Sequence, residues 1–319
     1  MARITGFVDQ NELEALYPIK IDKLFRSYST SGNTFTIIET GVSNPFRFDF
    51  TGTDFIINTE TDPVVRGGSI TGFRISYSEG QSWIELLSVS ESTLSASALQ
   101  AASLTSSQDD DVQIFETIFR EDDVFILSNG SNVVRAYSGN DVVNGGTGAD
   151  QLYGGAGSDN ISGGQGFDSL DGGEGNDLVR AGNGKDILTG GSGKDELWGG
   201  FGWNTFKGDK DGSEDLLVIK SDEWQVNSLN GKAGNNPDGS KCDIIEALDS
   251  IDKIIIQGVN TSELSFAANV SGQGLIGIGI YAKGALEALY TGVDLTVAQL
   301  TAMTTGDVTG PANGTYWSW

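Results

Sequence analysis

The stretch that decides the fold of this chain is GGTGADQLY GGAGSDNIS GGQGFDSLD GGEGNDLVR AGNGKDILT GGSGKDELW, residues 145–198. It consists of six consecutive nonapeptides in which glycine recurs at positions 1, 2 and 4, aspartate at position 6 and an aliphatic residue at position 8. A weaker copy precedes it at 136–144, and a degraded copy follows at 199–207. A short fixed period of this kind predicts a solenoid, in which each repeat stacks on its neighbours.

Each recurrent residue type has a physical role in the nonapeptide. Glycine tolerates the positive φ values of a tight turn, so we expect positive φ at positions 1, 2 and 4 and carbonyl oxygens that approach a common centre. The aspartate supplies carboxylate oxygens, which hard divalent cations prefer. The apolar residue at position 8 is expected to lie in a short strand and point inward, giving this core column: Val143, Leu152, Ile161, Leu170, Val179, Leu188, Leu197 and Phe206.

The pattern resembles the G-G-x-G-x-D-x-U-x repeat of the hemolysin-type, or RTX, calcium-binding proteins, where U is a large apolar residue. The resemblance implies a central parallel β-roll in which each nonapeptide is half a coil, so that residues 18 apart stack on one side. The predicted calcium ligands form two ladders, Asp141, Asp159, Asp177 and Asp195 on one side, and Asp150, Asp168, Asp186 and the amide Asn204 on the other. It also implies one calcium ion between successive turns on the same side, about six ions in total.

The charge of the chain agrees with cation binding. Acidic residues number 44 and basic residues 19, and the formal net charge is −25. Six calcium ions would bring about +12 and cancel roughly half of this charge. Without calcium the stacked carboxylates repel one another, so we expect the roll to be unfolded or expanded.

A second acidic motif follows the repeats. Asp209, Asp211 and Asp215 lie in the sequence DKDGSED, which begins like a D-x-D-G calcium loop. The segment lacks the glutamate at loop position 12 that an EF-hand requires. We therefore treat these three aspartates as candidate ligands of one further calcium site that would close the roll.

The chain as a whole is predicted to be mainly β, with an N-terminal α+β capping or interaction module at 1–117, the calcium-binding β-roll at 118–207 and a C-terminal β-rich module at 208–319. In the first module we expect these elements: helices at 10–16, 92–104 and 112–119, a strand at Phe46–Phe50 ending in a turn at Thr51–Thr53, and a hairpin of 70–77 with 82–87. In the last module we expect strands at 215–220, 253–257, 275–282 and 285–290, and a helix from Asp294 to Met303.

Composition excludes several classes of function. The chain has no histidine and a single cysteine, Cys242, so it cannot build a Ser-His-Asp triad, a Cys-His pair or an H-E-x-x-H zinc site. Its acidity disfavours nucleic acid as a partner, and its apolar stretches are too short for insertion into a membrane. A glycosidase with paired carboxylates is a weaker hypothesis, because no acid pair stands out beyond the repeats. We therefore predict that the protein is not an enzyme.

The two ends of the chain bear on localisation. The N-terminus lacks the charged segment and apolar segment of a cleaved signal peptide. The region after the repeats resembles C-terminal regions of secreted bacterial RTX proteins, and this resemblance implies an uncleaved export signal read by a type I secretion transporter. The expected location is then extracellular or on the cell surface, where calcium is abundant enough to fold the roll.

Two functions remain from different classes. The first is a structural protein that assembles with copies of itself into an extracellular layer or filament. The second is a secreted adhesin or module that binds a cell-surface glycan, with the roll as a calcium-rigidified spacer. Apolar residues at outward positions favour subunit contacts, unless the flanking modules cover them: Tyr153, Leu178, Ile187, Trp198, Phe201 and Trp203.

Overall fold

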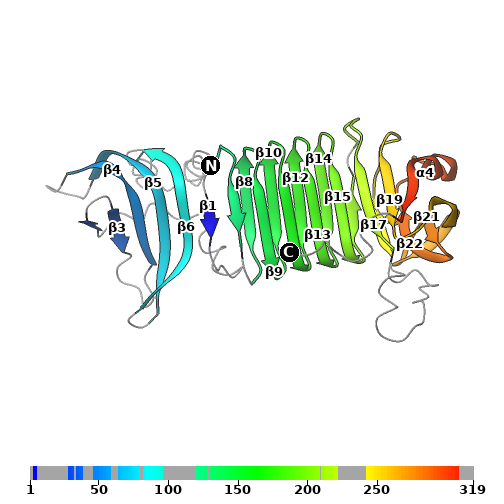
Figure 1. Ribbon diagram of the computed structural model, residues 1–319, viewed down its shortest axis with the longest axis horizontal. Coiled ribbons are helices and arrows are strands. Elements are labelled where there is room, and N and C mark those ends of the chain that lie inside the picture. Colours follow the sequence, from blue (N-terminus) through cyan, green and yellow to red (C-terminus); the bar gives the residue numbers. More distant parts are fainter. Residues whose placement is uncertain are drawn as a thin grey trace. The chain divides into compact units, whose positions relative to one another are not determined.

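The computed structural model describes the backbone of six strands between residues 3 and 95, and the complete residues 119–127, 130–208, 210–221 and 242–308. The chain divides into two units, Met1–Asn144 and Gly145–Trp319. Figure 1 labels the elements of both units.

The described residues of the first unit include an antiparallel sheet with three long strands. Its strands are β1 (Arg3–Thr5), β2 (Tyr28–Ser31), β3 (Thr34–Ile38), β4 (Phe46–Asn58), β5 (Val64–Glu79) and β6 (Ser82–Ser95). They follow the order β2-β3-β4-β5-β6-β1, and β1 then pairs in parallel with β7 (Val124–Ile126). Two further strands, β8 (Val133–Ser138) and β9 (Val142–Thr147), begin the repeat region, and β9 pairs in parallel with β7.

The N-terminal strands confirm two predictions and correct two others. The strand at Phe46–Phe50 and the hairpin of β5 with β6 are present. The turn predicted at Thr51–Thr53 is wrong, because β4 continues through it with irregular register, and a β-bulge absorbs extra residues without reversing the chain. The helix predicted at 92–104 is wrong at its start, where β6 runs to Ser95. The remainder of that segment, the helix at 10–16 and the helix at 112–119 except Phe119 lie outside the described residues.

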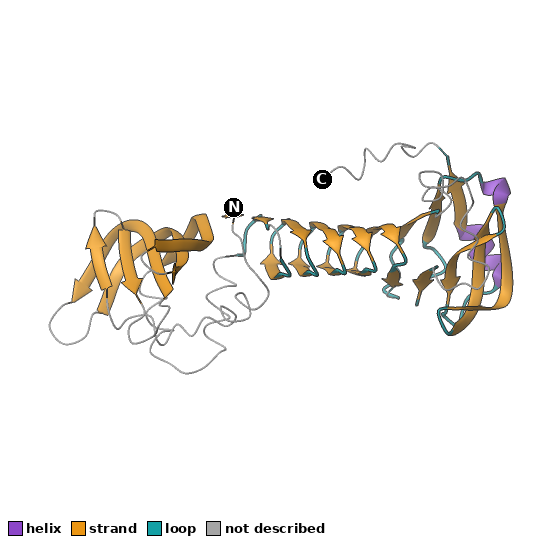
Figure 2. Cartoon of the chain, turned by 90° about the horizontal axis from the view of Figure 1, so that it is seen from below, coloured by secondary structure: helices purple, strands orange, loops and turns teal. Residues whose placement is uncertain are grey.

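The second unit begins with a parallel β-roll, which confirms the predicted fold class. One sheet contains β10 (Gln151–Ala156), β12 (Ser169–Glu174), β14 (Ile187–Ser192) and β16 (Thr205–Lys207). The other contains β11 (Asn160–Gly166), β13 (Leu178–Gly184), β15 (Glu196–Gly202) and β17 (Leu216–Lys220). Figure 2 shows these strands as two layers joined by short turns. Leu152 pairs with Leu170, so two nonapeptides make one coil.

The interior of the roll is the predicted column of position-8 side chains. Each of these residues exposes at most 2 % of its surface: Val143, Leu152, Ile161, Leu170, Val179, Leu188, Leu197 and Phe206. Burial of one such side chain contributes about 1.5–3 kcal/mol. Because each strand from β10 to β16 buries a single large side chain, the apolar core of these coils is only one large residue wide per strand.

The C-terminal strands extend both sheets of the roll. They are β18 (Asp243–Ile245), β19 (Lys253–Gln257), β20 (Leu264–Gly272), β21 (Leu275–Ala282), β22 (Ala285–Tyr290) and β23 (Thr304–Asp307), with a 3-10 turn η3 (Thr261–Glu263) and the helix α4 (Val297–Met303). One sheet continues through β17-β19-β23, and the other continues through β16-β18-β22 before closing with the antiparallel strands β21 and β20.

The predicted C-terminal strands are confirmed, with β17 beginning one residue later than expected. The helix does not begin at Asp294, however. Thr296 is its N-cap, because its hydroxyl oxygen accepts a hydrogen bond from the Gln299 backbone N–H at 3.3 Å while Gln299 Oε1 accepts from the Thr296 N–H at 3.0 Å. The carboxylate of Asp294 instead accepts a hydrogen bond from the Tyr290 hydroxyl at 2.7 Å.

Candidate metal centre

The roll stacks its aspartates into two ladders. In each step, the backbone N–H of one aspartate donates to Oδ1 of the residue on the next coil. The first side shows this from Asp159 to Asp177 at 2.7 Å and from Asp177 to Asp195 at 2.8 Å. The second side repeats it for three steps of 2.9, 2.9 and 3.0 Å, through Asp150, Asp168, Asp186 and Asn204. In the first unit Asp141 accepts in the same way from the Asp123 N–H at 2.6 Å.

The second carboxylate oxygen is the unusual feature of these ladders. Asp168, Asp177 and Asp186 expose at most 2 % of their surface, and Oδ2 of each has no hydrogen-bond partner. Desolvation by burial is the main cause that raises the pKa of each of these three carboxyl groups to about 7. Neighbouring ladder carboxylates raise the pKa of Asp168 and Asp177 further. A buried anion with an unbonded oxygen is costly without a cation beside it.

The first glycine of the nonapeptide makes room for this oxygen. A Cβ at Gly163 would lie 2.5 Å from Asp168 Oδ2 and 2.7 Å from the carbonyl oxygen of Ala181 on the next coil. The prediction of positive φ at position 1 is wrong, because positive φ occurs at positions 2 and 4, as at Gly164 (+107°) and Gly166 (+148°). Where glycine holds position 1 it therefore contributes space, and the carboxylate and carbonyl oxygens gather where a side chain would otherwise stand, although the repeat at 181 has alanine there.

This donor set suits a hard divalent cation. Carboxylate and carbonyl oxygens are the ligands that calcium prefers. In the part of the chain that the structure describes, no group of three or more acidic or cysteine side chains converges on one point. A cation in the ladder would therefore take one or two carboxylates from adjacent coils and complete its shell with backbone carbonyls and water.

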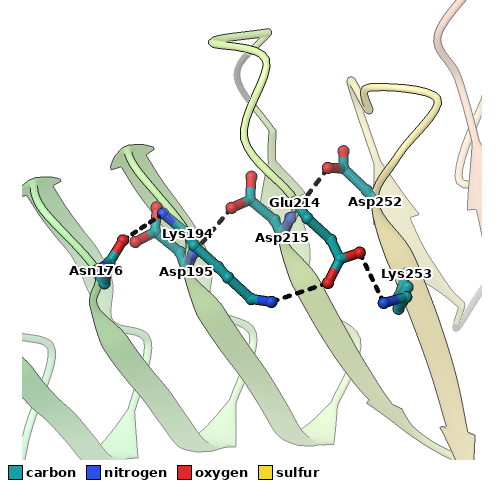
Figure 3. Close-up of polar contacts among 7 residues, drawn as sticks. All are labelled: Asn176, Lys194, Asp195, Glu214, Asp215, Asp252 and Lys253. Carbon is teal, nitrogen blue, oxygen red and sulfur yellow. Dashed lines mark hydrogen bonds and ion pairs between the residues drawn. The ribbon is translucent and has the colours of Figure 1, made fainter.

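The ladders continue beyond the nonapeptides, a continuation that the repeat period does not predict. Oδ1 of Asp215 accepts from the Asp195 N–H at 2.9 Å, and Oδ1 of Asp252 accepts from the Asp215 N–H at 3.1 Å (Figure 3). On the other side Oδ1 of Asp243 accepts from the Asn204 N–H at 2.5 Å. The spacing of 18 residues is lost here, but each added aspartate still stands two residues before a buried apolar residue, as in the repeats, and this signal could have identified it.

The three aspartates of the DKDGSED motif have separate positions. Asp215 is a ladder member, whereas Asp209 lies outside the described residues. Asp211 is exposed, and its two oxygens accept from the Gly193 N–H at 2.6 Å and the Ser213 N–H at 2.7 Å. These bonds hold the pKa of Asp211 below its usual value. In the two preceding coils, the N–H groups of Gly157 and Gly175 donate to backbone carbonyl oxygens of the next coil. At Gly193 the Asp211 carboxylate takes the place of such a carbonyl.

Ion pairs accompany the last ladder steps. The carboxylate of Glu214 lies 2.8 Å from Lys194 Nζ and 2.7 Å from Lys253 Nζ, so it bridges the residue before Asp195 and the residue after Asp252 (Figure 3). These hydrogen bonds lower the pKa of Glu214 to about 2. The positive charge beside these steps of the ladder therefore comes from lysine side chains.

Comparison with known proteins identifies the repeat. Residues 120–152, 153–188 and 180–212 match the family model of the RTX calcium-binding nonapeptide repeat. No curated protein and no solved structure matches the chain. The chain therefore carries RTX repeats, which bind Ca²⁺, and the β-roll that they form is a calcium-binding structural domain of a kind that is typically non-enzymatic. RTX repeat proteins are typically secreted, and none of the helices in the described residues has the length and apolar character needed to cross a membrane.

Proposed function

We propose that the chain is a secreted structural protein whose β-roll folds when it binds calcium outside the cell, and which then assembles with copies of itself into an extracellular layer or filament. The observation that carries this proposal is the buried Oδ2 atom without a hydrogen-bond partner at Asp168, Asp177 and Asp186. These carboxylates stack at 18-residue intervals, and no lysine or arginine is among the buried side chains of the described residues. Bound calcium would supply the missing positive charge.

The calcium sites in this proposal lie between successive turns on the same side. Their carboxylate ligands are the ladder members named above, and a count of adjacent pairs gives about six ions. Asp211 is a weaker candidate than its motif suggested, because both of its oxygens already accept backbone hydrogen bonds. Asp215 is a stronger candidate, since it repeats the contacts of the nonapeptide aspartates.

Export and assembly are the other two parts of the proposal. A type I secretion transporter would pass the calcium-free chain, because the unneutralised ladders oppose folding where calcium is scarce. Outward apolar side chains support assembly. Ile187 is 37 % exposed, and Tyr153, Leu178, Trp198, Phe201 and Trp203 are half-buried.

Calcium titration tests this function. Purified protein is taken from chelator to about 10 mM calcium, the range of weak extracellular sites, while circular dichroism, light scattering and bound calcium are measured together. We expect strand signal to appear first and ordered particles to follow. A folded monomer that binds a glycan array would contradict assembly in favour of an adhesin, and the absence of any folding response would contradict the calcium-dependent roll.

Two matched variants assign the ligands. Asp177→Asn keeps the Oδ1 acceptor but removes the charge, so we expect it to bind fewer calcium ions and to fold at severalfold higher calcium. Glu174→Gln is the control, because its carboxylate is exposed and belongs to neither ladder. Equal calcium binding by the wild type and Asp177→Asn would contradict the ladder as the metal site.

A further inference from the structure

The turns on the two sides of the roll differ in chemistry. Each rim consists of turns together with the strand ends that lead into them. The polar rim comprises 154–158, 172–176, 190–194 and 210–214, and the aromatic rim comprises 145–149, 163–167, 181–185 and 199–203. The aromatic rim contains no aspartate or glutamate in any of its four turns, whereas the polar rim includes Glu174, Asp211 and Glu214. In a chain of net charge −25, an acid-free side is the side where a second acidic molecule meets the least repulsion.

Hydrogen bonds run along the polar rim. The Asn176 backbone N–H donates to Ser158 Oγ at 3.3 Å, and the Lys194 N–H donates to Asn176 Oδ1 at 2.8 Å. Figure 3 shows how the Lys194 side chain then reaches Glu214, which also meets Lys253. The polar rim is therefore a polar, internally hydrogen-bonded surface that also carries exposed acids at Glu174 and Asp211.

The aromatic rim presents apolar surface and positive charge. Phe167 is 71 % exposed at the tip of its turn, and Ile187 beside the next turn is 37 % exposed. Lys185 is exposed on the coil after Phe167. On the following coil Lys220 Nζ lies 3.3 Å from the centroid of the Phe201 ring, a cation–π contact. Aromatic side chains are among the residues enriched in protein interfaces.

We propose that the aromatic rim of one molecule docks on the polar rim of a second copy of this chain. Both rims repeat once per coil, with about 4.8 Å between coils, so a roll laid beside another meets it turn by turn. An opposite charge is available as well, because Lys185 would face Glu174. The lysines of the polar rim, Lys194 and Lys210, are instead paired with Glu214 and Asp294 within the chain. The contact is heterologous and leaves one rim of each kind unoccupied, so the assembly continues to grow. This inference rests on the proposed self-assembly and names its surface.

Sedimentation velocity over a concentration series, in saturating calcium, tests the docking surface. We expect Phe167→Ser to raise the dissociation constant by about tenfold or more. Ile276→Ser is the matched control, since Ile276 is 70 % exposed in the C-terminal hairpin, away from both rims, and its loss should leave association unchanged. Each variant is compared with the wild type by circular dichroism during calcium titration, so that lost folding is not mistaken for lost docking.

A charge exchange provides a second test that does not depend on Phe167. Lys185→Glu alone and Glu174→Lys alone should each weaken association, and the double variant should recover it. If the wild type assembles while Phe167→Ser and Lys185→Glu assemble equally well, the aromatic rim is not the contact, although self-assembly stands. If the wild type stays monomeric at every concentration, self-assembly itself is wrong. Equal losses in Ile276→Ser and Phe167→Ser would also contradict a contact specific to the rim.

Discussion

The roll and the C-terminal region share the same two sheets but are stabilised in different ways. In the nonapeptide coils, each strand from β10 to β16 buries one large side chain, and the turns bury an aspartate or, at the end, Asn204. Oδ2 of Asp168, Asp177 and Asp186 has no hydrogen-bond partner. In the C-terminal region some strands bury nearly all of their residues: all three residues of β18 and five of the six residues of β22 are buried. The last ladder member there, Asp252, accepts on both oxygens, from the Asp215 N–H at 3.1 Å and the Asp249 N–H at 2.6 Å.

This difference shows that one sheet can change its source of stability along its length. The hydrophobic effect scales with buried apolar area, and a core one residue wide supplies little of it per residue. The roll depends on cations to offset its buried carboxylates, whereas the C-terminal strands depend on apolar packing and on carboxylates whose oxygens are bonded within the protein. Four changes distinguish stabilisation by cations from stabilisation by apolar packing: removal of calcium, truncation of core side chains, substitution of glycines in the turns, and a change of pH.

Removal of calcium should have the largest effect. We expect a calcium chelator to abolish hydrogen-exchange protection at residues 145–207, because the ladder charges are then uncompensated. Protection in β19, β21 and β22 should survive at least in part, since those strands bury apolar side chains. Hydrogen exchange measured by mass spectrometry on matched samples checks this. Equal loss of protection in both regions would show that they form one cooperative unit.

Truncation of the core column should come next. Leu170→Ala removes the single inward side chain of β12, which is 1 % exposed, and should lower the free energy of unfolding by about 2–5 kcal/mol in saturating calcium. Leu289→Ala provides the comparison in β22, where Leu289 is fully buried among other apolar residues. Urea unfolding of both variants measures the two costs. A cost at Leu170 below about 1 kcal/mol would mean that the cations, rather than the core column, hold the coil.

Glycine substitutions should have smaller effects and should differ between the regions. Gly284 has φ +87° and no atom within 4 Å of the position that a Cβ would take, so Gly284→Ala should cost about 1–2 kcal/mol of backbone strain alone. Gly164 has φ +107°, and a Cβ there would collide with the carbonyl oxygen of Gly146, so Gly164→Ala should cost clearly more. Thermal unfolding in calcium compares them. Equal costs would indicate that the coils separate easily at the turns.

The pH dependence of the calcium-free protein should be the smallest effect. Burial raises the pKa of Asp168, Asp177 and Asp186 from 3.8 to about 7 in the fold, so between these values the folded chain binds more protons than the unfolded chain. Their contribution to stability is complete below pH 3.8 and is lost as pH rises through about 7. Residual strand signal without calcium should therefore be greater at pH 5 than at pH 8, by circular dichroism. Calcium affinity should change in the opposite direction, because protons compete for the same oxygens.

The sequence alone predicted the parts of the fold that depend on the nonapeptide period. Asp159, Asp177 and Asp195 stack as expected because a strict repeat gives every coil the same length, so contacts between coils follow from counting residues. The inward position of Leu170 follows from the same period. The C-terminal strands were predictable from apolar runs, but the helix start depended on the capping box at Thr296, which the prediction of a start at Asp294 did not include.

The tertiary structure determined the features that the nine-residue period does not set. Asp215, Asp243 and Asp252 join the ladders across separations of 20, 39 and 37 residues, and only the folded path of the intervening chain sets which backbone N–H each carboxylate meets. The role of the first glycine was also decided in three dimensions. Its backbone angle is ordinary, and its missing side chain matters because oxygens from its own turn and from the next coil occupy that space. Local repetition determines a solenoid, whereas its ends and its ion sites depend on contacts between coils.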